Sequence, residues 1–373
     1  MKRNIKIDFL KVFGIISVVL GHCIPTDCVL SRIIYLINIP VFFIVSGYLY
    51  SYKDEKNNNI WTFLGKKIGR FWKYYFIYCL IFVIFRNLFV KVGILGKGCN
   101  AYGLQEFLFG FANGALFISN EPFSAAMWFI PVLIIGLTVF NSIIYYSSKF
   151  DGKKKYAVQL LLVLFTTFVG YIYNKNNMNI GLHYQTSLFI QVFMLIGYYY
   201  KLNEEKISKS KNIDIIRAII IVLTIFIIGT VINFTKVKID LSANFIPHPI
   251  IFIVCASLFT VSLYYIADYI LIINKKTLDN KIVSYISRNT ISIMCLHILV
   301  FKTVDLIICH IINNTDKLSL FPYSFSGLPI VYTVSGVIIP LLIHYVYELM
   351  VGLILKRKQI YLLLGGNYEE LNT

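Results

Sequence analysis

The chain of 373 residues is strongly apolar: hydrophobic residue types make up 58% of it, charged types only 14%, and the mean hydropathy is +0.72. A soluble domain carries about 25% charged residues, so these values exclude a soluble protein, and also a soluble domain with one anchor. A net charge of +17 suggests nucleic acid as a partner in a soluble protein. Here we assign the Lys and Arg residues to loops that fix topology and meet anionic lipid, and we expect no nucleic-acid partner.

Ten apolar runs are long enough to cross a lipid bilayer. They cover about 7–24, 32–50, 71–90, 126–147, 156–173, 184–200, 215–234, 248–273, 290–312 and 329–355. With the N-terminus in the cytoplasm, 25 of the 35 Lys and Arg residues fall in inner segments and 8 in outer ones, as the positive-inside rule requires. The sequence therefore predicts an all-α integral membrane protein, a bundle of about ten transmembrane helices with both termini cytoplasmic. We expect a single domain over 1–373, with the membrane bundle at 1–355 and a short cytoplasmic tail at 356–373.

The first run carries three residues that an apolar helix normally avoids, Asp8, Lys11 and His22. Lys11 and His22 are about three helical turns apart, so they share one face with Asp8 and are separated by roughly 16 Å along the axis. Because a charge near the bilayer centre costs about 2.5–3.5 kcal/mol on insertion scales, ionisable residues in a span are functional candidates.

The end of the second run and the loop after it differ in character. Ser46 and Gly47 are small residues that allow close helix packing. The following stretch is amphipathic, with the basic residues Lys66, Lys67, Arg70 and Lys73 between aromatic ones. Two readings stay open: an interfacial helix that binds lipid headgroups, and a cytoplasmic site for a phosphorylated ligand.

The outer connection at 91–125 is the longest, and Glu106 and Glu121 are its candidate polar contacts for an acceptor. In the ninth run, His297 lies roughly 15 Å inside the inner interface, near the midplane. Lys302 and Asp305 are three residues apart and are expected to pair. One histidine in an apolar run is usually a packing residue, but two, with basic residues on the cytoplasmic side, favour a site. The seven cysteines show no metal-ligand spacing, and we expect no metal.

Five blocks occur in order along the chain: IDFLKVFGIISVVLGH at 7–22, FFIVSGYLY at 42–50, FLGKKIGRFWKYY at 63–75, MWFIPVL at 127–133 and NTISIMCLH at 289–297. In these blocks the chain resembles the acyltransferase-3 family, membrane-bound acetylases that decorate bacterial surface sugars, and most closely the fucose O-acetylase-like branch. The resemblance implies one ten-span acyltransferase domain in the bacterial cytoplasmic membrane. It would move acetyl from cytoplasmic acetyl-CoA, the donor, to a hydroxyl of a surface glycan or its lipid-linked precursor.

The resemblance also assigns residues. His22 matches the family's essential first-span histidine, Lys11 the basic residue of that motif and Asp8 the acidic residue before it. Arg70 matches the basic position after the second span, and His297 the late-span histidine. Many members carry two arginines in an R-x-x-R arrangement where this chain has Asp8 and Lys11, and a lysine lacks the bidentate fork of arginine.

The chemistry agrees with these assignments. An alcohol needs a general base, so we expect His22 to deprotonate the acceptor or to become transiently acylated itself. Asp8 and Lys11 are expected to bind each other and orient the donor, and Lys66, Lys67 and Arg70 to bind the phosphates of CoA. His297 is a second acid/base candidate with a structural alternative.

Two functions from other classes remain as alternatives. In a multi-span transporter or flippase of a sugar or lipid-linked substrate, the His, Lys and Asp residues would line a pathway. Against it, no matched pair of broken helices is visible in two halves of the chain. The other alternative is a non-catalytic scaffold or sensor.

Overall fold

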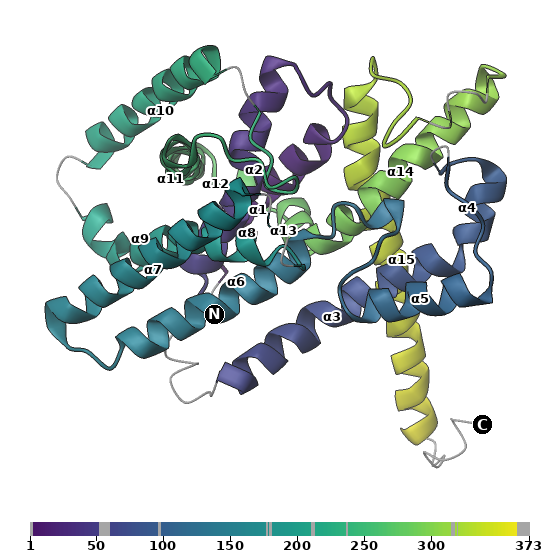
Figure 1. Ribbon diagram of the computed structural model, residues 1–373, viewed down its shortest axis with the longest axis horizontal. Coiled ribbons are helices and arrows are strands. Elements are labelled where there is room, and N and C mark those ends of the chain that lie inside the picture. Colours follow the sequence, from purple (N-terminus) through teal and green to yellow (C-terminus); the bar gives the residue numbers. More distant parts are fainter. Residues whose placement is uncertain are drawn as a thin grey trace.

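The computed structural model describes residues 3–51, 60–95, 98–176, 178, 181–209, 213–235, 238–314, 318 and 320–363, and over these ranges its regular elements are helices. The helices are α1 (Ile5–Gly21), α2 (Val29–Tyr48), α3 (Ile60–Ile84), α4 (Arg86–Val92), α5 (Leu104–Ala115), η1 (Pro122–Ser124), α6 (Phe129–Ser147), α7 (Gly152–Lys175), α8 (Tyr184–Phe189), α9 (Gln191–Ser208), α10 (Ile213–Thr235), α11 (Pro249–Ile273), α12 (Lys275–Leu278), α13 (Lys281–Arg288), α14 (Thr290–Ile311) and α15 (Pro329–Leu363). Figure 1 shows their arrangement.

Seven helical stretches within the described residues are long and apolar enough to cross a membrane. They are Val29–Tyr48, Pro122–Ser147, Gly152–Lys175, Ile213–Asn233, Pro249–Ile273, Thr290–Ile311 and Pro329–Val351; the bent pair Trp61–Ile84 and Arg86–Val92 would be an eighth. Of the other predicted spans, α1 has 17 residues, and α9 carries four charged residues near its end. The protein is therefore an all-helical multi-pass membrane protein. The count of ten spans and the cytoplasmic termini stay predictions.

Helix α1 lies near the middle of the assembly (Figure 1) and contacts α2, α11, α13, α14 and α15. Its buried residues cover rather more than half of the helix circumference, and Ile16 on the remaining side is exposed. The helix starts at an Asn4 N-cap, whose side chain accepts hydrogen bonds from the amides of Lys6 and Ile7. Because α1 contacts these five helices, the position of its candidate functional residues is fixed by several neighbouring elements.

Helices α2 and α9 approach each other at two glycines. A Cβ atom built on Gly47 would lie 2.0 Å from the carbonyl oxygen of Met194, and one on Gly197 would lie 1.9 Å from that of Ile44. No side chain fits at these separations. The sequence prediction that Gly47 allows close packing is confirmed, and Gly197 is its counterpart on α9.

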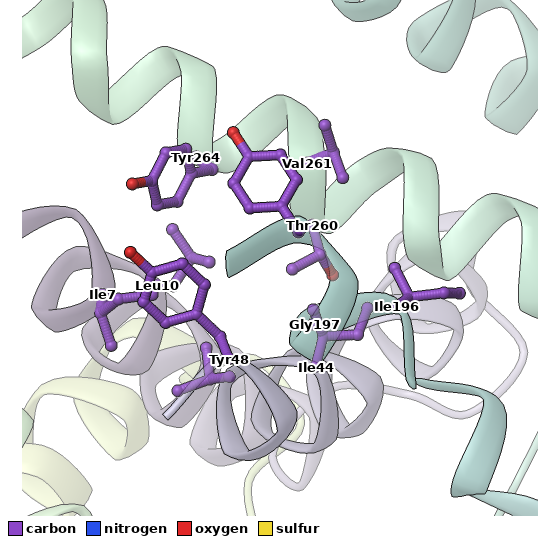
Figure 2. A pocket seen from close by; sticks show the side chains of 11 residues that line it. Ile7, Leu10, Ile44, Tyr48, Ile196, Gly197, Thr260, Val261 and Tyr264 are labelled. Atoms are coloured by element: carbon purple, nitrogen blue, oxygen red, sulfur yellow. The ribbon is translucent and has the colours of Figure 1, made fainter. Parts of the chain in front are cut away.

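Beside this crossing, α1, α2, α9 and α11 surround a small apolar pocket, which Figure 2 shows with Tyr48 and Tyr264 at its rim. Its volume is about 20 Å³, which is room for about one water molecule. The hydroxyls of both tyrosines donate to the carboxylate of Glu204, and Lys201 pairs with the same carboxylate at 3.1 Å. We interpret the pocket as a packing gap beneath a structural polar network.

Replacing Gly197 with alanine should destabilise the protein, because α2 and α9 must move apart to admit the methyl group. Overpacking of this kind costs about 1–3 kcal/mol or more. The matched control is Gly229→Ala on α10, where an added Cβ meets no atom within 4 Å and alanine is favoured by up to about 1 kcal/mol. Thermal unfolding in detergent measures both variants. Equal melting temperatures for the two would contradict the close α2–α9 packing.

Candidate active site

Two histidines from opposite ends of the chain lie against each other. His22 caps the C-terminus of α1, its backbone N–H donating to the carbonyl oxygens of Val18 and Val19, both at 3.2 Å. His297 lies in the buried part of α14. The centroids of the two imidazole rings are 5.2 Å apart, with the ring planes tilted by 41°. The structure thus brings together the two histidines that the sequence selected.

The hydrogen bonding of His297 determines its tautomer. Its Nδ1 lies 3.0 Å from the carbonyl oxygen of Ile293. Because a carbonyl oxygen only accepts, Nδ1 carries the proton and Nε2 of the neutral ring is an acceptor. His297 is 0% exposed, and Nε2 has no hydrogen-bond partner among the described residues. Nε2 is therefore the atom of this ring that can accept a hydrogen bond or a proton.

Packing on the far side keeps His297 in place. The ring of Phe301 meets it edge-on at 5.6 Å and also meets the ring of Tyr332 on α15. A Cβ on Gly336 would lie 2.8 Å from Phe301, 2.9 Å from Val19 and 3.5 Å from the Cβ of His297. Only glycine therefore lets α15 close over α1 and α14 at the level of the histidines.

A fully buried ion pair anchors the C-terminal half of α14. The Nζ atom of Lys302 lies 2.8 Å from Asp305, both side chains are 0% exposed, and Nζ also donates to the carbonyl oxygens of Leu318 and Leu320. The hydroxyl of Tyr332 donates to the same aspartate. The predicted pairing of Lys302 with Asp305 is confirmed, and it ties the loop before α15 to α14.

A cavity of about 620 Å³ leads toward the histidines along α1 and α14. This volume is typical of a small-molecule site. Its lining residues are Lys11, Ile15, Val18, Ile39, Phe42, Val45, Ser46, Leu49, Tyr50, Ser51, Lys67, Arg70, Phe71, Tyr74, Phe129, Leu133, Leu137, Arg288, Asn289, Thr290, Ile291, Ser292 and Met294. Four of them are basic and none is acidic, whereas the wall nearer the histidines is apolar. The cavity suits a ligand that carries both anionic and apolar groups.

Not all of the basic residues proposed from the sequence line the cavity. Lys11, Lys67 and Arg70 line it, whereas Lys66 is exposed on α3 and does not. Arg288, at the end of α13, is a further lining cation that the sequence did not single out as a candidate. The position of Arg288 at the cavity depends on the packing of α13 against α1, a tertiary contact that the sequence does not show.

Asp8 does not bind Lys11 as predicted. One of its carboxylate oxygens pairs with Arg3 at 2.6 Å, and the other accepts the hydroxyl hydrogen bond of Ser287, also at 2.6 Å. The reason is geometric, since α13 packs on α1 and offers Ser287 to this carboxylate. Asp8 therefore holds α13, and with it the neighbouring Arg288, at the cavity.

Glu106 and Glu121, the candidate acceptor contacts, also have structural partners. Glu121 forms an ion pair with Arg86 at 2.9 Å, and both side chains are less than a tenth exposed. Glu106 accepts from the backbone N–H of Gly103 and so caps α5. Among the described residues, no group of three or more His, Cys, Asp or Glu side chains could hold a metal ion.

Comparison with known proteins gives one match. The model of the acyltransferase-3 family, described as an acyltransferase domain, matches residues 4–346 and so spans nearly the whole chain. Curated proteins and solved structures give no match. The matched range includes α1, the cavity and both histidines.

Proposed function

Because the chain belongs to the acyltransferase-3 family, we propose that it moves an acetyl group from cytoplasmic acetyl-CoA to a hydroxyl of a surface glycan or its lipid-linked precursor. The observation that carries the proposal is the contact between His22 and His297 next to a cavity that is lined by four basic residues. The proposed setting is the bacterial cytoplasmic membrane, with ten spans, both termini inside and a relationship to the fucose O-acetylase-like branch.

The donor fits the cavity by charge and shape. CoA carries several phosphates, and Lys67, Arg70 and Arg288 are available for them at the mouth, since Arg and Lys are the usual phosphate ligands in proteins. The pantetheine arm is long and thin and would follow the α1 face past Lys11, Ile15 and Val18. These three residues and His22 fall on one stripe of the helix. The thioester would then arrive next to the histidines.

The transfer step needs a base for the acceptor hydroxyl. His22 is half-buried, whereas His297 is fully buried, so a bulky acceptor reaches His22 first. The imidazole takes the hydroxyl proton while the oxygen attacks the thioester carbonyl carbon. The C–S bond breaks, the acetyl ester forms, and the proton passes from the imidazole to the CoA thiolate. His297, with its free Nε2, is a partner that His22 can share the proton with.

The family match favours this chemistry over a transporter or flippase. The same geometry supports a second route within it, in which the ring of His22 attacks the thioester and carries the acetyl group before the acceptor does. In that route the label from acetyl-CoA would appear briefly on the protein.

Replacing His22 with alanine should lower acetyl transfer by about 10²–10⁴-fold, the usual contribution of a general base. Membranes containing either chain are incubated with radiolabelled acetyl-CoA, and label is measured in the glycan or lipid-linked sugar. The control is His310→Ala, an exposed histidine at the outer end of the same helix as His297. It should behave as wild type.

Transfer retained by His22→Ala at wild-type protein levels would refute the assignment. CoA release without labelled glycan would identify the donor and leave the acceptor open. No CoA release with any acceptor mixture would favour the transporter.

The basic residues at the cavity mouth make a separate prediction. Arg70→Ala should raise the KM for acetyl-CoA about tenfold or more, because a hydrogen bond to a charged group contributes about 1.5–3 kcal/mol. Lys66→Ala removes an equal charge from the same helix outside the cavity and should change KM by less than about twofold. Initial rates against acetyl-CoA concentration measure both. Equal effects would mean that charge alone, and not the cavity, binds the donor.

A further inference from the structure

The cavity ends one helical turn before the two histidines. Val18 lines it and precedes His22 by four residues on α1, while Met294 lines it and precedes His297 by three residues on α14. The helical rise places each apolar residue about 4–6 Å before its histidine. Neither histidine lines the cavity. A group that moves from the cavity to the imidazoles along α1 and α14 therefore passes Val18 and Met294.

The two lining side chains nearest the histidines along α1 and α14, Val18 and Met294, are apolar. Val18 is 4% exposed and Met294 is 7% exposed. Phe42 of α2 packs against Gly14, one turn before Val18, and its ring lies 5.7 Å from that of Phe129 on α6; both phenylalanines line the cavity. The basic residues of the mouth are absent from this end. Such a surface favours a small apolar group and disfavours water and charge.

We infer that Val18 and Met294 form the passage through which the acyl group reaches the histidines, and that their side chains set the acyl chain length that the protein accepts. This inference rests on the proposed function and deepens it. Val18 is β-branched and stiff, so it forms a fixed wall. Met294 is unbranched with rotatable bonds, so it adapts to a short acyl group. A longer acyl chain meets both side chains before its carbonyl carbon reaches His22.

The passage also separates two aqueous compartments in the proposed topology. The mouth of the cavity opens on the cytoplasmic side, and the acceptor approaches His22 from beyond the passage. A thioester that fills the passage keeps cytoplasmic water away from the reacting carbonyl. The selection of short acyl groups and the exclusion of water thus depend on the same two side chains.

The test compares acetyl-CoA with butyryl-CoA, which carries two more methylenes. Met294→Ala and Val18→Ala should each raise the butyryl-to-acetyl ratio of kcat/KM by about tenfold or more, since one methylene in an apolar pocket changes kcat/KM by about 10–200-fold. The assay measures CoA release and label transfer in membranes of the full chain. Leu296→Ala is the matched control: Leu296 is equally buried on α14, between Met294 and His297, and does not line the cavity. Its ratio should stay at the wild-type value.

Each outcome decides the inference. A ratio raised in Met294→Ala and Val18→Ala and unchanged in Leu296→Ala supports the passage. An unchanged ratio in active Met294→Ala overturns it. So does complete loss of activity in Met294→Ala when the volume-conserving Met294→Leu is active, because a wider passage still admits acetyl. If the wild-type chain uses neither acetyl-CoA nor butyryl-CoA, the proposed function is refuted, and the inference with it. If the wild-type chain uses both donors at equal rates, only the inference is refuted.

Discussion

The structure depends on the contact between two imidazole rings, the half-buried His22 at the end of α1 and the fully buried His297 of α14. An apolar bundle accepts polar groups only where the backbone or another side chain satisfies them. His297 meets this requirement at Nδ1 through the carbonyl oxygen of Ile293, and its Nε2 is left without a partner among the described residues. The packing that keeps the rings together extends through Phe301 to Tyr332 and is closed by Gly336. The free nitrogen is thus held in place by apolar contacts.

The charged side chains that are buried in the described part of the chain all form ion pairs, and the cations of the cavity differ from them. Lys302 with Asp305 and Arg86 with Glu121 are buried pairs with short contacts. Such pairs fix local geometry, since a lone buried charge costs several kcal/mol. Among the described residues, Lys11, Arg70 and Arg288 take part in no ion pair, although they share one cavity. Unpaired cations around one cavity are suited to an anionic ligand.

Much of the architecture follows from sequence because hydrophobic length and charge are local properties. The apolar runs coincide with long helices, and the i,i+3 spacing of Lys302 and Asp305 was enough to predict their ion pair. His22 and His297 were identifiable because an ionisable residue in an apolar run is rare.

Tertiary contacts were not predictable in the same way. The sequence paired Asp8 with Lys11, its neighbour on the helix, whereas the folded chain pairs it with Arg3 and Ser287. Lys66 and Lys67 are adjacent in sequence, and only the rotation of α3 against the bundle decides that Lys67 lines the cavity. The most direct test of the central claim is a double-mutant cycle on acetyl transfer with His22→Gln, His297→Gln and the double variant. If the two rings act as one unit, the double variant loses no more activity than the more damaged single variant. If the two losses multiply, the histidines act independently, and the account of a paired catalytic centre is wrong.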